Sequence, residues 1–234
     1  MHPGCWHSGR FGRPAPLDTT VDLAPGFPYL TAMTKREILT IPDPILRQSA
    51  APIERGDDEL RRLMDDMLET MYEAPGIGLA APQVGVSRRL IVMDVGEERA
   101  EDYERQTAGE VPPTTAAAAK SKKSAPPPSE ARRPICMVNP EIIYLGSQFK
   151  VYEEGCLSLP EVRIDIERPS SLKVRYIDRR GHAQVLAAEG LLATVIQHEV
   201  DHLDGKLIID FLSRLKRDMI VRRFRKAKKG EDIA

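Results

Sequence analysis

The chain has 234 residues, of which 41% are hydrophobic and 29% are charged, enough to bury the core of one large domain, with or without appendages. Its net charge of −1 and aromatic content of 5% argue against a nucleic-acid partner, and no apolar run approaches the roughly 20 residues that span a membrane. The three cysteines, Cys5, Cys136 and Cys156, form no disulfide framework and suit a reducing cytosol. We therefore expect a cytoplasmic protein without a membrane partner, and a monomer by default.

Two segments have a low-complexity composition and no apolar periodicity. Residues 1–32 are rich in Gly and Pro and are expected to form a disordered leader, with Met33 as an alternative start. Residues 97–134 contain a run of Ala, Pro, Ser and Lys that cannot bury enough apolar surface to offset its ordering entropy. We expect a disordered insertion there. Because neither flank alone carries a full set of chemistry, residues 33–234 are expected to form a single catalytic domain.

The first regular element is an amphipathic helix followed by a glycine-containing loop. Leucines and methionines recur at helical spacing over residues 60–71, after Asp57 as a candidate N-cap. The next segment, residues 76–83, reads GIGLAAPQ. Its two glycines lack the third glycine or Lys-Ser/Thr pair of a phosphate loop, so a nucleotide site is disfavoured. Small residues here would let a peptide backbone approach, and Gln83 offers an amide donor, although such a loop is most often structural.

Short β-like runs separated by turn signals follow the insertion, over residues 135–188. Among them, residues 154–160 read EGCLSLP, and Cys156 lies in the turn beside a glycine. Such a cysteine is often a small buried apolar residue. A thiolate at this position, combined with two imidazoles from elsewhere, would leave one position of a tetrahedral metal site open for water.

An H-E-x-x-H motif occupies the next predicted helix, over residues 190–205. Because residues four apart share a helical face, His198 and His202 can both face one metal ion, with Glu199 beside them to handle the proton of a water. A histidine pair on a packed helix can also be merely hydrogen-bonded. Two protease extensions of the motif are incomplete, since Ile208 stands where a third histidine would be needed and the only downstream glutamate, Glu231, lies near the end.

A basic helix is expected over residues 213–229. We expect Leu212, Leu215, Met219 and Ile220 to dock it on the domain. Its cations are Arg214, Lys216, Arg217, Arg222, Arg223, Arg225, Lys226, Lys228 and Lys229. Such a run is usually a solvated face, and ribosomal RNA phosphates are the alternative partner. Together the elements predict an α+β domain of mainly antiparallel strands around the H-E-x-x-H helix.

Three motifs in this order, G-I-G-L-A-A-P-Q, E-G-C-L-S and Q-H-E-x-D-H-L-x-G, closely resemble the peptide deformylase family. The resemblance spans roughly residues 38–225 outside the insertion. It implies that Cys156, His198 and His202 hold a metal and that Glu199 is the catalytic acid/base. Members of this family remove the formyl group from the initiator methionine of new bacterial or organellar polypeptides, and they are α+β proteins.

The same resemblance implies that the Gln83 amide and the Leu157 backbone N–H stabilise the oxyanion of the reaction. Residues on the helical face of His198 could line a pocket for a methionine side chain, and an extended peptide could pair with the chain at residues 76–78. Ile77 and Tyr152 could equally be core residues, and Arg163 could be only a surface charge. The expected substrate contacts are Gly76, Ile77, Gly78, Tyr152, Glu154, Gly155, Arg163, Leu191, Thr194 and Val195.

The ligand set suits zinc as well as ferrous iron, and the family resemblance implies Fe(II), with nickel or cobalt as substitutes. We therefore expect a deformylase that acts on nascent N-formylmethionyl polypeptides and releases formate. Two alternatives remain open on the sequence. One is a metallo-endopeptidase that uses the same H-E-x-x-H motif, and the other is an inactive, RNA-associated binding module.

Overall fold

The computed structural model describes residues 34–96 and 132–231. The predicted leader, residues 1–32, and residues 97–131 of the predicted insertion lie outside this described part of the chain.

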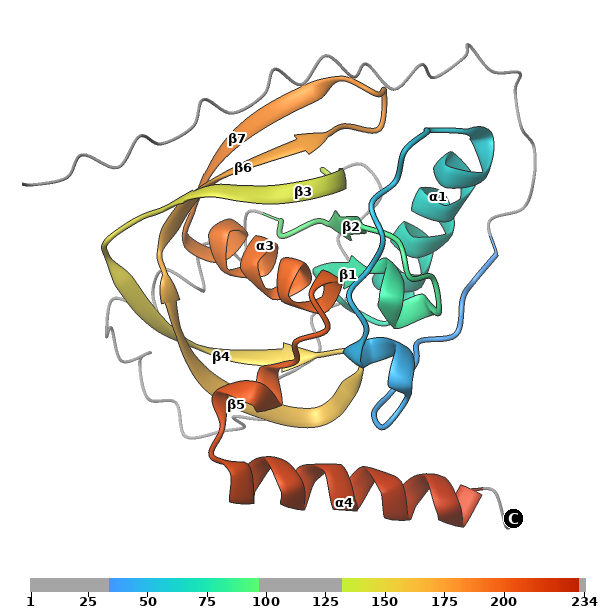
Figure 1. Ribbon diagram of the computed structural model, residues 1–234, viewed down its shortest axis with the longest axis vertical. Coiled ribbons are helices and arrows are strands. Elements are labelled where there is room, and N and C mark those ends of the chain that lie inside the picture. Colours follow the sequence, from blue (N-terminus) through green and yellow to red (C-terminus); the bar gives the residue numbers. More distant parts are fainter. Residues whose placement is uncertain (1–33, 97–131, 232–234) are drawn as a thin grey trace, which may run out of the picture.

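Helices and strands are mixed along the chain, and Figure 1 shows helix α3 enclosed between two layers of strands, with helix α4 at one side of the molecule. The helices are η1 (Pro44–Arg47), α1 (Asp58–Glu73), η2 (Ala81–Val84), α3 (Gly190–Leu203), η4 (Ile208–Phe211) and α4 (Arg214–Glu231). The strands are β1 (Gly78–Ala80), β2 (Leu90–Met93), β3 (Ile135–Leu145), β4 (Phe149–Cys156), β5 (Leu159–Pro169), β6 (Ser171–Ile177) and β7 (Ala183–Glu189).

The strands form a five-stranded sheet in the order β1-β2-β3-β6-β7 and a two-stranded sheet of β4 and β5. Every neighbouring pair in both sheets is antiparallel. Strand β1 lies at one edge of the larger sheet, so one of its sides has no strand partner within the described residues. The predicted α+β class, with antiparallel strands around the H-E-x-x-H helix and a C-terminal helix, is confirmed.

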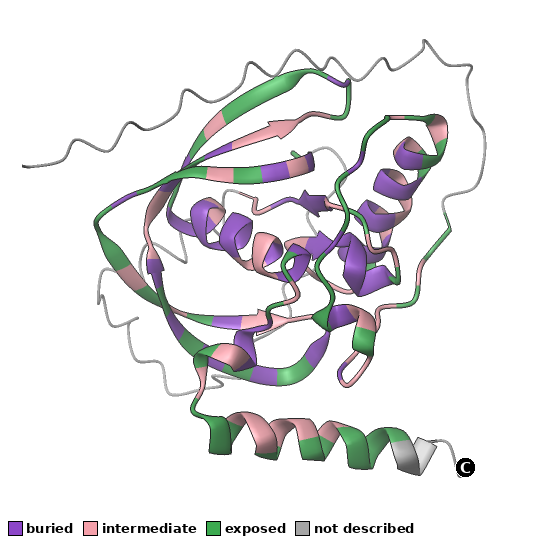
Figure 2. Cartoon of the chain, in the orientation of Figure 1, coloured by how far each residue is buried: buried purple, intermediate pink, exposed green. Residues whose placement is uncertain are grey.

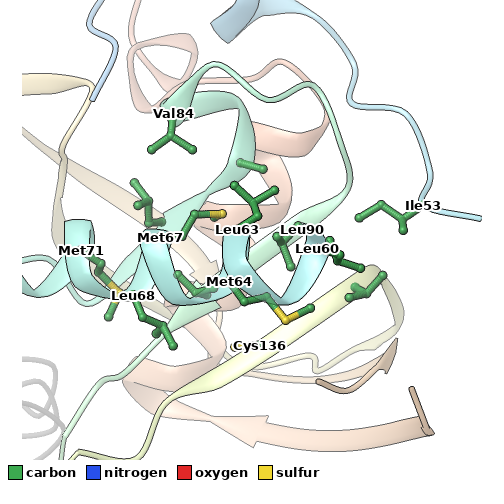
Figure 3. Packing of buried hydrophobic residues seen from close by; sticks show 14 of the residues in the cluster. Ile53, Leu60, Leu63, Met64, Met67, Leu68, Met71, Val84, Leu90 and Cys136 are labelled. Carbon is green, nitrogen blue, oxygen red and sulfur yellow. The ribbon is translucent and has the colours of Figure 1, made fainter. Parts of the chain in front are cut away.

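Helix α1 forms where its apolar spacing predicts. The Asp57 side chain accepts a hydrogen bond from the Leu60 backbone N–H at 2.8 Å, which caps the first turn. One face of the helix is then buried against β1, β2 and the start of β3, as Figure 3 shows. The buried face consists of Leu60, Leu63, Met64, Met67, Leu68 and Met71.

Helix α3 follows β7 without a loop and is the most enclosed helix in Figure 2. Gly190 begins it with a φ of +56°, which a glycine adopts without strain. At its other end Gly205 has a φ of +72°, and an added Cβ would lie 2.7 Å from the Arg47 carbonyl oxygen. Between these glycines α3 buries Leu191, Ala193, Val195, Ile196 and Leu203 against the five-stranded sheet. The H-E-x-x-H motif is therefore carried by a core helix.

Of the four residues expected to dock α4, Leu212 and Ile220 pack on a core cluster, and Leu215 and Met219 do not. Leu215 and Met219 are 73% and 62% exposed, whereas Ile220, Val221 and Phe224 pack on the core cluster beneath β5. The reason is helical phase, because Leu215 and Met219 lie on the side of α4 opposite to these three residues. Across the described part of the chain, no helix is long and apolar enough to cross a membrane.

Replacing Met67 by alanine should destabilise the fold by about 2–5 kcal/mol, because this fully buried side chain would leave a cavity between α1 and the sheet. The matched change Met219→Ala, on the exposed side of α4, should alter stability by less than about 0.5 kcal/mol. Denaturant unfolding of both variants measures the difference, and equal losses of stability would contradict this account of the core.

Candidate metal centre

The three predicted metal ligands lie together at the junction of the two layers. Cys156 ends β4, and His198 and His202 extend from α3. Their candidate ligand atoms all lie within 4.8 Å of one another, and the Cys156 Sγ is 3.1 Å from the His202 Nε2. The register of the β4–β5 pair shifts between Gly155 and Cys156, and such an irregularity re-aims the side chain that follows it. Residues 46 positions apart in sequence thus form one cluster.

The chemistry of this cluster fits a divalent metal ion. One thiolate and two imidazoles are three ligands of a tetrahedral site, and the fourth position remains available for water or substrate. Burial holds the pKa of His202 well below its usual range, so its imidazole is neutral and can offer a lone pair to a metal. No second cluster of three such side chains occurs within residues 34–96 and 132–231.

A buried carboxylate orients the first histidine. The Glu154 Oε2 lies 2.8 Å from the His198 Nδ1, which leaves the Nε2 of the ring as the nitrogen free for a metal. Arg168 donates to both oxygens of Glu154 and also to Asp201 at 2.9 Å. Burial opposes the charge of Glu154, but hydrogen bonds from His198 and Arg168 bring its pKa below the usual value. Glu154 was expected to contact the substrate, but its carboxylate is instead hydrogen-bonded to His198 and Arg168.

Sequence reasoning missed Arg168 and Asp201, although a signal for Arg168 was present. Along β5, Val162, Ile164 and Ile166 are buried while the residues between them are exposed. Arg168 continues this period-2 alternation, so the pattern predicts that its side chain points inward. A buried arginine in turn requires an anionic partner. Asp201 carried no comparable signal, because its partner comes from another element.

Glu199, the predicted acid/base, is buried against β1. Its side chain is only 4% exposed, and a Cβ added to Gly78 would lie 2.3 Å from the Glu199 Oε1. Position 78 therefore needs glycine so that the carboxyl group can lie beside the histidines. Burial raises the pKa of Glu199 to about 7, against the attraction of His198 and with a further contribution from the charge of Glu154. A carboxyl group with this pKa can accept and return a proton near neutral pH.

Gln83 is held rigidly beside the cluster. Its Oε1 accepts a hydrogen bond from the Ala80 N–H at 2.8 Å, and its Nε2 donates to the Ser158 Oγ at 3.1 Å. The same Nε2 lies 3.6 Å from the Cys156 Sγ, so the amide N–H groups point toward the ligand cluster. Leu157 follows Cys156 directly, and its side chain packs against the α1 core. Ser158, which orients the amide of Gln83, was not predicted from the sequence.

The residues expected around a methionine side chain come together in one apolar cluster. This cluster joins Leu191 and Val195 of α3 with the partly buried Ile77 and Tyr152. Thr194 is buried on the same helix, and its hydroxyl donates to the Gly190 carbonyl at 3.3 Å. The expected pocket residues other than Thr194 thus belong to the core cluster around α3.

Gly76, Gly155 and Arg163 lie at the borders of this region. An added Cβ at Gly76 would meet the Leu157 Cδ1 at 2.9 Å, and one at Gly155 would meet the Arg163 Nη1 at 2.5 Å. Arg163 is exposed, and its guanidinium group lies on the Gly155 backbone, opposite to it in the β4–β5 pair. Both glycines thus keep the backbone accessible to close neighbours.

Comparison with known proteins agrees with this arrangement. The family model for polypeptide deformylase matches residues 35–218. A peptide deformylase of Rhizobium meliloti (strain 1021) is 46% identical over 197 residues, which cover 84% of this chain and 96% of the relative. The crystal structure of an Ehrlichia chaffeensis peptide deformylase in complex with actinonin has 35% identity and a TM-score of 0.67, covering 83% of this chain and 98% of that one. A Met-Ala-Ser-bound peptide deformylase structure from Acinetobacter baumannii has 31% identity and a TM-score of 0.61, over 77% and 100% of the two chains. The chain belongs to the polypeptide deformylase family.

Proposed function

We propose that this chain is a metal-dependent hydrolase that removes the formyl group from the N-formylmethionine of newly made polypeptides and releases formate. The observation that carries the proposal is the cluster of Cys156, His198 and His202 with Glu199 beside it, in a chain of the deformylase family. A divalent cation held by these three ligands would supply Lewis acidity, which makes water a stronger nucleophile at neutral pH.

The residues of the chain would move the protons and stabilise the charge. Glu199 takes a proton from the attacking water and returns it to the amine nitrogen as the bond between the formyl carbon and that nitrogen breaks. The formyl oxygen gains negative charge in the transition state. The Gln83 amide and the Leu157 backbone N–H are the proposed donors to this oxygen, and a donor of this kind typically lowers the barrier by about 2.7–4 kcal/mol.

The edge position of β1 supports a peptide substrate. Because one side of β1 has no strand partner in the described structure, an extended chain can add there through its main chain, along residues 76–78. The methionine side chain would then enter the apolar cluster formed by Ile77, Tyr152, Leu191 and Val195, with Thr194 at its side. Arg163 and Gly155 would contact the substrate beyond its first residue.

Replacing Glu199 by glutamine should reduce formate release from formyl-Met-Ala-Ser by about 10²–10⁴-fold, because the amide cannot take up the proton. The control Glu189→Gln, at the exposed N-cap of the same helix, should leave the rate unchanged. Both rates are measured on protein purified without oxygen, with metal content determined in parallel.

The remaining outcomes of this experiment separate the alternative functions. Cleavage of unformylated peptides without formate release would indicate an endopeptidase. A protein that holds about one metal per chain but turns over neither substrate would indicate a binding module. A Glu199→Gln variant with wild-type formate release would remove Glu199 from the mechanism.

Replacing Glu154 by glutamine should weaken metal binding by about 10–100-fold, because the amide no longer accepts a charge-assisted hydrogen bond from His198 and Arg168 loses one of its two carboxylate partners. The control is Glu153→Gln, on the exposed face of the same strand. Competition with a metal chelator measures the two affinities, and thermal unfolding checks that both variants fold. Equal affinities would contradict the role assigned to Glu154.

We propose Fe(II) as the native metal, as the family resemblance implies. Zinc, nickel and cobalt are the alternatives, because a thiolate and two imidazoles accept all four ions. Metal analysis of protein purified without oxygen tests the assignment. An Fe(II)–thiolate site should lose activity on treatment with peroxide, and full activity after that treatment would count against iron.

We propose that helix α4 contacts the ribosome, which would place the enzyme beside newly made polypeptides. We also propose that the enzyme is a monomer and acts in the cytoplasm. Among its described cations, Arg222, Arg225, Lys226 and Lys228 are exposed and make no ion pair with other described residues. Binding to ribosomes should fall steeply with added salt. The double variant Arg222→Gln/Arg225→Gln should make the dependence of log affinity on log salt shallower, by about one in slope for each phosphate that is no longer neutralised. Absence of binding at low salt would reject the ribosome as a partner. The molar mass in solution, measured by light scattering, tests whether the protein is a monomer.

A further inference from the structure

A second cleft lies on the face of α3 that points away from the metal cluster. Its volume is about 580 Å³, within the range of small-molecule sites. Its lining comes mainly from α3, β3 and the end of β5, which are labelled in Figure 1. Residues that line it include Ile142, Leu145, Arg168, Val200, Asp201 and Lys206. None of the proposed metal ligands or substrate contacts lines this cleft.

Helical phase separates the two sites. At 100° per residue, His198 and His202 lie 40° apart on α3, whereas the mean direction of Val200 and Asp201 is about 130° from that of the two histidines. A ligand in the cleft would therefore not reach the metal position. Helix α3 thus contributes residues to the metal cluster on one side and to the cleft on another.

The charges of the cleft leave one cation without a partner. Arg89 pairs with Asp204 at 2.8 Å, and Arg168 pairs with Asp201 at 2.9 Å and also with Glu154 outside the lining, so each of these charges has a partner. The remaining cation in the lining, Lys206, is exposed and makes no ion pair with any residue of the described chain. The remaining anion, Glu141, pairs with Arg175 outside the cleft. The cleft therefore favours a ligand with a single negative charge.

The other wall is apolar. Ile142 and Leu145 of β3 face Val200 of α3 across the cleft, and Leu145 is 50% exposed at its mouth. A large apolar side chain left open beside a concave surface is typical of a binding surface. An alkyl or aryl group could bury itself on this wall while a charged end remains near Lys206.

We propose that this cleft is a second binding site, which takes a small organic monoanion with an apolar part, such as a carboxylate on a short alkyl chain. The carboxylate lies near Lys206, and the alkyl chain lies along Ile142, Leu145 and Val200. The bound ligand would contact the Arg168–Asp201 ion pair. Arg168 also donates a hydrogen bond to Glu154, which is hydrogen-bonded to His198.

Octanoate is the probe, titrated into zinc-loaded full-length protein while backbone amide signals are followed by NMR. The expected shifts are confined to Arg89, Arg168 and residues 139–145 and 197–206. Octan-1-ol, which has the same chain without the charge, should bind at least about tenfold more weakly. Shifts centred on residues 76–78 and Cys156 would place octanoate in the metal site and overturn the proposal. Absence of shifts at millimolar octanoate, or equal binding of the alcohol, would also overturn it.

Two pairs of variants locate the ligand. Val200→Trp fills the cleft and should abolish binding, whereas Val185→Trp, at a residue 62% exposed on β7, should not. Lys206→Glu should weaken octanoate binding by about tenfold, whereas Lys173→Glu, at an exposed lysine of β6, should leave it unchanged. Because Lys206 is exposed, its variant should fold even if Val200→Trp does not. Wild-type affinity in folded Lys206→Glu protein would reject the assigned carboxylate position.

Discussion

The metal centre depends on one buried carboxylate, that of Glu154, which joins the β4–β5 pair to helix α3. Glu154 is hydrogen-bonded to His198 of the helix and to Arg168 of the neighbouring strand. Arg168 also donates a hydrogen bond to Asp201 on the helix. Burying such charges is costly unless each has a partner with good geometry, so the four side chains are stable only as a set. This set fixes the ring of His198 and, with it, the position of the helix relative to Cys156.

Close packing between β1 and α3 is the second constraint. Gly78 leaves only enough space for the carboxyl group of Glu199, so the strand that is proposed to receive the substrate also positions the proposed acid/base. The apolar neighbours of Glu199 remove water and bring its pKa to about 7, a value useful for proton transfer. The burial that makes α3 a core helix therefore also raises the pKa of the Glu199 carboxyl group into a range suited to proton transfer.

Helix α3 also divides the molecule into two chemical environments. The face with His198 and His202 meets Cys156 and the apolar cluster, and the opposite face meets the cleft beside Lys206. The Arg168–Asp201 ion pair lies between them and is part of both. Direct side-chain contacts through Arg168 and Glu154 therefore link Asp201 to His198.

The sequence by itself determined the elements whose signals are local. Apolar periodicity and the Asp57 cap specified α1, and the H-E-x-x-H spacing placed two histidines on one face of α3 because helical geometry is fixed. The order of three short motifs was sufficient to indicate the family, and the period-2 pattern of β5 carries a signal for an inward Arg168 that our predictions did not include.

Tertiary structure alone decided which partners meet. Asp201 and Ser158 acquire their roles from residues on other elements, Arg168 and Gln83, and no local pattern encodes such pairings. Likewise, α4 carries apolar residues on both sides, and only the position of β5 determines that Phe224 packs inward while Leu215 faces solvent. The physical reason is that spacing along a chain fixes the direction of a side chain relative to its own element, whereas contacts depend on how separate elements pack.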